Sequence, residues 1–197
     1  MAWIKTVPPS EASGQLKEVY DGILKTMPFV PKMRQLASLR PGAVEALELL
    51  AKRSHFGGTS LGREREERIA LVVAALLKCT YCAVAHGGLM VKSGKATADQ
   101  VSALACNYHD AGLSAADVAM LDYAAKIALD PERISEADIT GLREHGFSDV
   151  NILDIALNAS YRVFVTRMAA ALGLEGEEWF AEIAPPLRET LTVGRRL

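Results

Sequence analysis

Apolar residues recur at helical spacing along most of the chain, whereas the alternation of apolar and polar positions typical of strands is nearly absent. No apolar stretch is bounded by the tight turns that join the strands of a hairpin. The pattern therefore predicts an all-α fold. The first helix is expected to be amphipathic, with apolar positions at Leu16, Val19, Tyr20, Ile23 and Leu24.

Breaking and capping residues divide this pattern into separate helices. Pro28 to Pro31 ends the first helix, and Pro41 suits the first turn of a helix that is expected to reach about Arg53. A hydroxyl residue followed three positions later by a polar partner marks a helix start. This signal occurs at Thr97 with Gln100, at Ser114 with Asp117 and at Ser135 with Asp138, and Ser148 opens a long helix that ends at Gly173.

Two stretches share an organisation that suggests an internal repeat. Residues 63–94 and residues 136–173 each combine a capped, amphipathic entry with a long apolar helix that ends in glycine. A length of 197 residues suits one domain, residues 1–197, with a sizeable core. The expectation is one helical bundle with a possible pseudo-repeat.

Composition and charge exclude several classes of protein. Half of the residues are apolar and the formal net charge is −2, so the chain lacks the basic excess that marks a nucleic-acid partner. The longest strong apolar run, Ile69 to Leu77, is far shorter than the 18 or more residues, roughly, that a membrane span needs. The first residues lack the features of a secretory signal. With three cysteines and one close pair, the sequence predicts a cytoplasmic protein with reduced thiols.

The stretch from Glu64 to Met90 carries the candidate chemistry. An acidic cluster leads into an apolar helix, and a Cys-x-x-Cys pair follows at Cys79 and Cys82, with His86 one helical turn beyond the second cysteine. If this segment is helical, residues at i, i+3 and i+7 share one face. The two thiols and the imidazole then project together as a candidate dithiol redox centre.

Either cysteine of the pair could be the nucleophile. Thiolate is the reactive form, and Cys79 lies nearer the expected helix start, where the helix dipole favours thiolate. Cys82 has His86 one turn away, so a base argument favours Cys82 instead. With a hydroperoxide, one cysteine attacks and becomes a sulfenic acid, the other condenses with it to a disulfide, and a thiol reductant reopens that disulfide. His86 would deliver the proton to the leaving oxygen, oriented by a carboxylate.

The acidic cluster offers Glu64, Glu66 and Glu67 as the carboxylate that orients His86. Their positions in the sequence do not select one of them. A carboxylate that enters a buried helix needs a partner. We therefore expect one of the three to point inward, toward the thiol–imidazole group.

Glu67, then Cys79 and Cys82, then His86 together resemble the pattern of the alkylhydroperoxidase D-like (AhpD-like) superfamily, which includes the carboxymuconolactone decarboxylases. The match is closest to the peroxidase-related members, in which an ERE-rich helix leads into a C-x-Y-C-x-x-x-H helix. Three further segments are similar to those members, and the resemblance covers roughly residues 4–180. These segments are EASGQLKEVYDGIL, VPKMRQLASLRPG and NASYRVFVTRMAAALGLE.

The resemblance implies a single AhpD-like domain, with its core at about residues 40–175, that assembles into trimers or hexamers. It implies that Cys82 attacks the peroxide and that Cys79 resolves the product. It also implies that Glu67 and His86 form a proton relay. The expected partners are a hydroperoxide substrate and a protein or small-molecule thiol reductant, and neither a cofactor nor a metal is expected.

One position departs from the family pattern. Alkylhydroperoxidase D proteins resemble C-x-H-C, and Tyr81 stands here at the position of their second histidine. A phenol, with a pKa of about 10, shuttles protons at neutral pH less readily than an imidazole. The departure bears on the relay to Cys79 and on the choice of reductant. Tyr81 is expected to pack or to orient its neighbours rather than to act as an acid.

Other readings use the same residues. The cysteines could be inert and buried on a core helix. A zinc site needs four ligands, and beside the cysteine pair and His86 the fourth would come from Glu67, Cys106 or His109. The chain could be a non-enzymatic module whose cysteines switch its oligomeric state or bind metal. It could also be a decarboxylase-like enzyme that uses Glu67 and His86 for acid–base chemistry on a lactone, although decarboxylase members lack the cysteine pair.

The leading hypothesis is a thiol-dependent peroxidase that reduces hydroperoxides at a Cys79–Cys82 dithiol centre. The remaining candidate residues receive no role at this stage. Cys106 is expected at the end of a helix, and His55 and His145 lie beside expected loops. Arg162 is expected on the solvated surface, where it could pair with an acid of a neighbouring subunit.

Overall fold

The structure is a computed structural model that describes residues 2–197, and within that range it contains helices and no strands. The predicted all-α fold is confirmed. The α-helices are α1 (Gly14–Leu24), α2 (Lys32–Gln35), α3 (Pro41–Ser54), α4 (Arg63–Leu76), α5 (Thr80–Lys92), α6 (Ala98–Asn107), α7 (Ala115–Leu129), α8 (Glu136–Glu144), α9 (Asp149–Ala171) and α10 (Pro185–Thr190). Short 3-10 helices are η1 (Pro9–Glu11), η2 (Tyr108–Asp110), η3 (Pro131–Arg133) and η4 (Glu178–Glu182).

Local side-chain chemistry sets the helix ends. Thr97 and Gln100 form a capping box at the start of α6, and the Ser114 hydroxyl accepts a hydrogen bond from the Asp117 N–H at the start of α7. Ser148 caps α9, the longest helix. These starts match the sequence predictions because each depends on residues only three positions apart.

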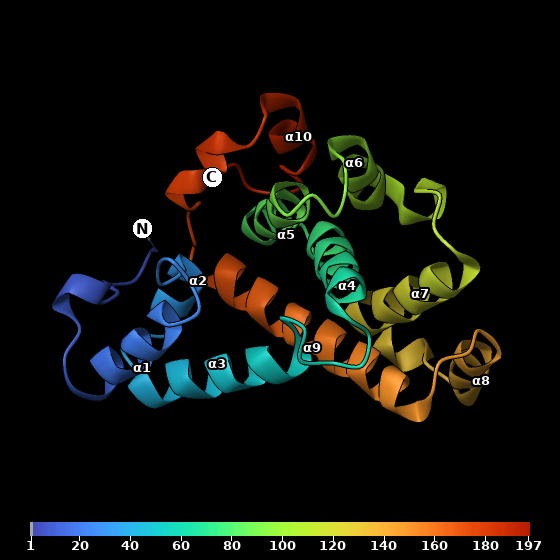
Figure 1. Cartoon of the computed structure of the whole chain (residues 1–197), viewed down its shortest axis with the longest axis horizontal. Coiled ribbons are helices and arrows are strands. Elements are labelled where there is room, and N and C mark those ends of the chain that lie inside the picture. Colours follow the sequence, from blue (N-terminus) through green and yellow to red (C-terminus); the bar gives the residue numbers. More distant parts are fainter. Residues whose placement is uncertain (1) are drawn as a thin grey trace.

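Helix α4 forms the centre of the bundle. It packs against α5, α7 and α9, and its apolar residues from Ile69 to Ala75 are buried on all sides of the helix. A helix that is apolar all round is stable only when it is enclosed in this way. Figure 1 shows α9 running diagonally across the molecule, with α1, α2 and α3 at one end and α7 and α8 at the other.

Two glycines bring the C-terminal segment close to α5. A Cβ atom at Gly88 would lie 2.5 Å from Ile183 Cδ1, and one at Gly87 would lie 2.8 Å from Leu191 Cδ1. Only glycine allows this approach. As a result η4 packs on α5, and Leu191 at the end of α10 reaches Gly87, while α10 itself packs on α6 (Figure 1). Within residues 2–197 no helix combines the length and the apolar character needed to cross a membrane.

Candidate active site

Cys79 and Cys82 lie at the junction of α4 and α5. Lys78 has a positive φ of 58°, and the Cys79 N–H donates a 2.9 Å hydrogen bond to Ala74 O. Helix α5 begins one residue after Cys79, so Cys79 is its N-cap, and only Cys82 and His86 lie within the helix. The two Sγ atoms still lie 2.9 Å apart, and they are not bonded to each other. The spacing of the two cysteines therefore does place their thiols in contact. They meet because Cys79 is the N-cap of α5 and Cys82 lies in its first turn, and not because both project from one face of a helix.

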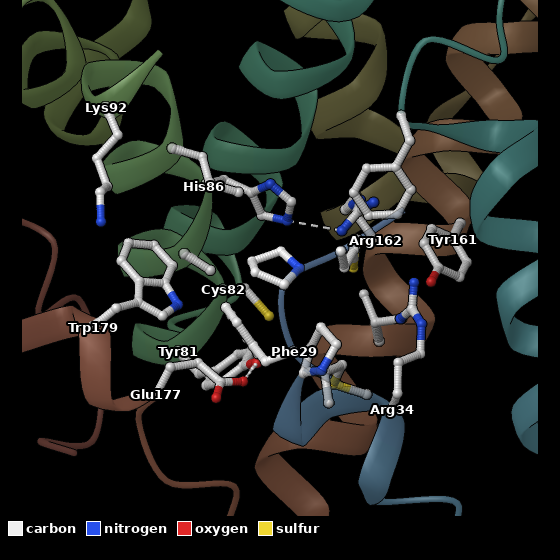
Figure 2. A pocket seen from close by; sticks show the side chains of 18 residues that line it. Phe29, Arg34, Tyr81, Cys82, His86, Lys92, Tyr161, Arg162, Glu177 and Trp179 are labelled. Atoms are coloured by element: carbon white, nitrogen blue, oxygen red, sulfur yellow. Dashed lines mark hydrogen bonds between the residues drawn. The ribbon is translucent and has the colours of Figure 1, made fainter. Parts of the chain in front are cut away.

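A cavity of about 370 Å³ gives access to one of the two sulfurs. Its walls are mostly apolar and come from residues 27–34, Phe56, α5, α9 and residues 177–179. Both cysteines are buried, but Cys82 lines the cavity and Cys79 does not. Figure 2 shows Cys82 and His86 between Trp179 on one side and Arg162 on the other. A substrate in the cavity would meet the Cys82 sulfur.

Glu67 is the carboxylate that contacts His86. Its Oε2 lies 2.6 Å from His86 Nδ1, its Oε1 lies 3.3 Å from His55 Nε2, and Arg63 Nη2 lies 2.5 Å from the same Oε1. The Glu67 side chain is buried and therefore depends on these three partners. The structure thus joins Glu67, His86 and His55 in one buried cluster, and His86 lines the same cavity as Cys82.

The other two glutamates of the acidic cluster serve different purposes. Glu66 is also buried, and its carboxylate accepts hydrogen bonds from the backbone N–H groups of Gly57 and Thr59 at 2.5 and 3.1 Å. It holds the loop that carries His55. Glu64 is exposed and pairs with Arg68. Two of the three glutamates therefore point inward, not one, because α4 is enclosed on more than one side.

His86 is held at both ring nitrogens. Arg162 Nη1 lies 2.8 Å from His86 Nε2 (Figure 2). A guanidinium only donates hydrogen bonds, so Nε2 is the acceptor, and Nδ1–H donates to Glu67. The geometry therefore assigns a neutral imidazole with its proton on Nδ1. A direct relay from His86 to Cys82 needs the Nε2 lone pair, and in this structure that lone pair faces Arg162.

Arg162 is buried, and the expectation that it lies on the solvated surface is wrong. Its residue is 4% exposed, and its Nε and Nη2 atoms have no hydrogen-bond partner within residues 2–197. It follows Ile155 by seven positions and Ala159 by three, so it belongs to the apolar stripe of α9 that packs inward. This spacing relative to Ile155 and Ala159 indicates a buried position in the sequence, although a charged side chain by itself favours an exposed one.

Burial governs the protonation of the acid and imidazole groups. Burial, and then the positive charge of Arg162, lower the pKa of His55 well below its ordinary value and lower the pKa of His86. Burial acts to raise the pKa of Glu67, but its interactions with His86 and His55 outweigh burial and hold that pKa well below its ordinary value. The cluster therefore contains an ionised carboxylate and two neutral imidazoles.

The two thiols share their protons unequally. The hydrogen bond with Cys82 lowers the pKa of Cys79, whereas the same hydrogen bond and burial raise the pKa of Cys82 well above its ordinary value. The guanidinium of Arg162 acts in the opposite direction on Cys82 and lowers its pKa. After the first ionisation the pair holds one proton between two sulfurs, and that proton lies on the side of Cys82.

Tyr81 is committed to a carboxylate rather than to a cysteine. Its hydroxyl donates a 2.5 Å hydrogen bond to Glu177 Oε1, which also accepts from the Lys32 N–H at 2.6 Å. Burial, and then the charge of Glu177, raise the pKa of Tyr81 well above its ordinary value. Tyr81 and Glu177 therefore fasten α5 to α2 and to the C-terminal segment that closes the cavity. Glu177 was not identified from the sequence.

Within residues 2–197, the residues that could jointly hold a metal ion are His55, Glu67 and His86, whose candidate ligand atoms lie within 4.8 Å of one another. This set excludes both cysteines, so the zinc site considered from the sequence does not assemble. Each imidazole already contacts the carboxylate, and the guanidiniums of Arg63 and Arg162 lie beside the cluster. The positive charges of these two guanidiniums oppose the binding of a metal cation.

The buried imidazoles predict a loss of stability at mildly acidic pH. Their pKa values are lowered in the folded protein, so below pH ~6.5 the unfolded chain binds protons that the folded chain does not. The free energy of unfolding is then expected to fall by up to about 1.4 kcal/mol per pH unit for each of His55 and His86. Urea unfolding at pH 8, 7, 6 and 5.5, roughly across the histidine range, measures this slope. Replacing the exposed His145 with glutamine should leave the slope unchanged, and a flat profile in the wild type would contradict the prediction.

Neither the protein-family models nor the curated proteins give a match to this chain. Solved structures do match. An uncharacterized peroxidase-related protein from Ralstonia eutropha JMP134, described as an alkylhydroperoxidase AhpD core, is 26% identical over 91% of this chain and 94% of its own, with a TM-score of 0.81. An uncharacterized peroxidase-related protein from Silicibacter sp. TM1040 is 27% identical over 90% of each chain, with a TM-score of 0.77.

A more distant match has a different named activity. The debrominase Bmp8 is 19% identical over 94% of this chain and 96% of its own, with a TM-score of 0.74. A Bmp8 variant with one cysteine replaced by alanine also matches, in a structure with 2,3,4-tribromopyrrole. At this level of identity the likeness concerns the fold.

Proposed function

This chain belongs to the alkylhydroperoxidase D-like superfamily, and from that premise we propose that it is a thiol-dependent peroxidase that reduces hydroperoxides at the Cys79–Cys82 pair. The observation that carries the proposal is the placement of the two sulfurs. They lie 2.9 Å apart, and one of them lines an apolar cavity. A dithiol in contact, with one sulfur open to a substrate, is what a cycle of attack and resolution requires.

In the proposed reaction the proton that the cysteine pair shares first moves from Cys82 to Cys79, and the Cys82 thiolate then attacks the terminal oxygen of the hydroperoxide ROOH. An S–O bond forms, the O–O bond breaks, and the second oxygen leaves with the electron pair. It takes the proton that the cysteine pair shares, which gives ROH, Cys82 sulfenic acid and Cys79 thiolate. Cys79 then attacks the Cys82 sulfur, a disulfide forms, and hydroxide leaves and becomes water with a proton from solvent. A dithiol or two monothiols reduce the disulfide.

Glu67 and His86 are proposed to act by position rather than by handing a proton to Cys82. Glu67 fixes the tautomer of His86, and His86 Nε2 holds Arg162 at the cavity. This differs from the direct relay that the family resemblance implies. The two mechanisms differ because His86 Nε2 contacts the guanidinium of Arg162, which cannot accept a proton, and is therefore not free to exchange a proton with Cys82.

A free-thiol count tests the proposal. Reduced wild-type protein is expected to fall from three free thiols to one after one equivalent of cumene hydroperoxide, and to recover three with dithiothreitol. In the Cys106→Ser variant, which lacks the exposed third thiol, the count should fall from two to zero. A count that stays at three in the wild type would contradict a peroxidase function. The acid–base alternative on a lactone predicts that outcome.

A second candidate function is reductive dehalogenation of a small halogenated aromatic compound. The aromatic side chains of Phe29, Phe56 and Trp179 at the cavity favour it, together with the fold shared with a debrominase. This reaction balances without a further reactant: two thiols and an aryl bromide give a disulfide, the arene, a bromide ion and a proton. In the same thiol count, loss of two thiols with a bromopyrrole and none with cumene hydroperoxide would favour this function.

A further inference from the structure

Two buried arginines line the same cavity but differ in their partners. Arg34, on α2, has its Nε 2.8 Å from Glu48 Oε2, so a carboxylate neutralises its charge. Arg162, on α9, donates through Nη1 to the neutral His86, and its Nε and Nη2 find no partner within the described residues. A buried charge and buried N–H groups are costly when they are unpaired. Arg162 therefore keeps binding capacity that the chain does not use itself.

The two free donors of Arg162 lie along one edge of the guanidinium. Nε–H and Nη2–H point side by side in the plane of the group, which is the arrangement that holds an oxyanion with two hydrogen bonds. The charge of Arg162 already acts on the thiol of Cys82, whose pKa it lowers. The third cation at the cavity, Lys92, is half-exposed and lies 2.6 Å from Glu182. Of these three cations, Arg162 is thus the one without a direct ion pair to a carboxylate.

Reduction of a hydroperoxide creates such an anion. When the O–O bond breaks, the departing oxygen carries the electron pair as an alkoxide until it is protonated. A mostly apolar cavity stabilises an alkoxide poorly unless a positioned donor compensates the charge. We propose that Arg162 is a catalytic residue whose Nε–H and Nη2–H bind the leaving oxygen of the hydroperoxide and stabilise its charge as the O–O bond breaks. This inference rests on the proposed peroxidase function.

Substrates with different leaving groups test this role. tert-Butyl hydroperoxide releases a strongly basic alkoxide, whereas 3-chloroperoxybenzoic acid releases a carboxylate that needs no such stabilisation. Single-turnover oxidation of Cys82 would be measured with both peroxides for the wild type, Arg162→Met, Arg162→Lys and Arg167→Met, the last being an exposed arginine on the same helix. Arg162→Met is expected to slow the reaction with tert-butyl hydroperoxide about 100-fold and that with the peracid by less than about fivefold. Arg162→Lys keeps the positive charge but lacks the paired N–H donors of a guanidinium, so its rate with tert-butyl hydroperoxide should lie between those of the wild type and Arg162→Met. Arg167→Met should react at the wild-type rate.

Each outcome separates this role from the proposed function. Equal slowing with both peroxides would mean that Arg162 acts on the thiol or on the fold and would overturn its role at the leaving oxygen. Unchanged rates with both peroxides would overturn it as well. If the wild type reacts with tert-butyl hydroperoxide no faster than a free thiol does, the peroxidase function itself fails. The peracid reaction also reports whether Cys82 remains accessible and the variant remains folded.

Discussion

Replacing Cys82 with serine is expected to slow the reaction with hydroperoxide by about 10³-fold or more, because a hydroxyl is a far poorer nucleophile than a thiolate. Two thiols remain in this variant, at Cys79 and Cys106. Cys79 should not be lost rapidly, since it is buried and does not line the cavity, and Cys106 lies on the surface, away from the cavity, and has no second thiol beside it. The measurement is the free-thiol count after one equivalent of cumene hydroperoxide, followed over time.

The matched variant is Cys79→Ser, which keeps the attacking sulfur and removes the resolving one. Its first oxidation step should persist, because the serine hydroxyl can still form a hydrogen bond with Cys82. The product should stop at Cys82 sulfenic acid, with loss of one thiol instead of two and a covalent adduct with a 1,3-diketone probe. Rapid oxidation of Cys82→Ser, together with an inert Cys79→Ser, would reverse the two roles. Inert behaviour of both variants would mean that neither thiol reacts alone.

The parts of the site that sequence could predict are those set by short separations. Cys79, Cys82 and His86 lie within eight consecutive positions, so a single turn and the helix after it bring them together. The capping residues were predictable for the same reason. Glu67 is farther away, but a tight turn joins the helix that carries it to the cysteine helix. The spacing alone left Glu64, Glu66 and Glu67 as alternatives, and only the packing around α4 separates them.

The parts that sequence could not predict depend on contacts between distant helices. Arg162 follows His86 by 76 positions, and His55 meets Asn158 of α9 across 103. Whether an arginine on an apolar stripe points inward depends on what the facing helix offers. Here α5 offers the Nε2 lone pair of His86. The pairing of Tyr81 with Glu177 likewise depends on the path of the C-terminal segment over α5, which the two glycines of that helix permit.

Glu67 is expected to be the most costly side chain of the site to remove. Replacing Glu67 with alanine leaves Arg63, His86 and His55 without the carboxylate that they share. Removal of one partner from a buried ion pair costs about 3–5 kcal/mol. For a chain of this length that loss should lower the melting temperature by roughly 6–20 °C. Urea unfolding at pH 7.5 and a thermal melt would measure the two quantities.

The matched control is Glu64→Ala, three positions earlier on the same helix. Glu64 is exposed, and its partner Arg68 also pairs with Asp117, so the change should alter the free energy of unfolding by less than about 1 kcal/mol. Equal losses in the two variants would mean that the buried cluster adds no stability of its own.

The pH dependence of that difference follows from the lowered pKa of Glu67. A carboxyl whose folded pKa lies below its unfolded pKa stabilises the protein above the unfolded value, about 4.3, and loses this contribution as the pH falls through the folded value. The difference in the free energy of unfolding between the wild type and Glu67→Ala should therefore persist from pH 7.5 down to pH ~5 and shrink only in stronger acid. A difference that instead grows between pH 7 and pH 6 would place a stabilising positive charge on the imidazoles. That result would contradict the neutral tautomer that the contact between Arg162 and His86 assigns.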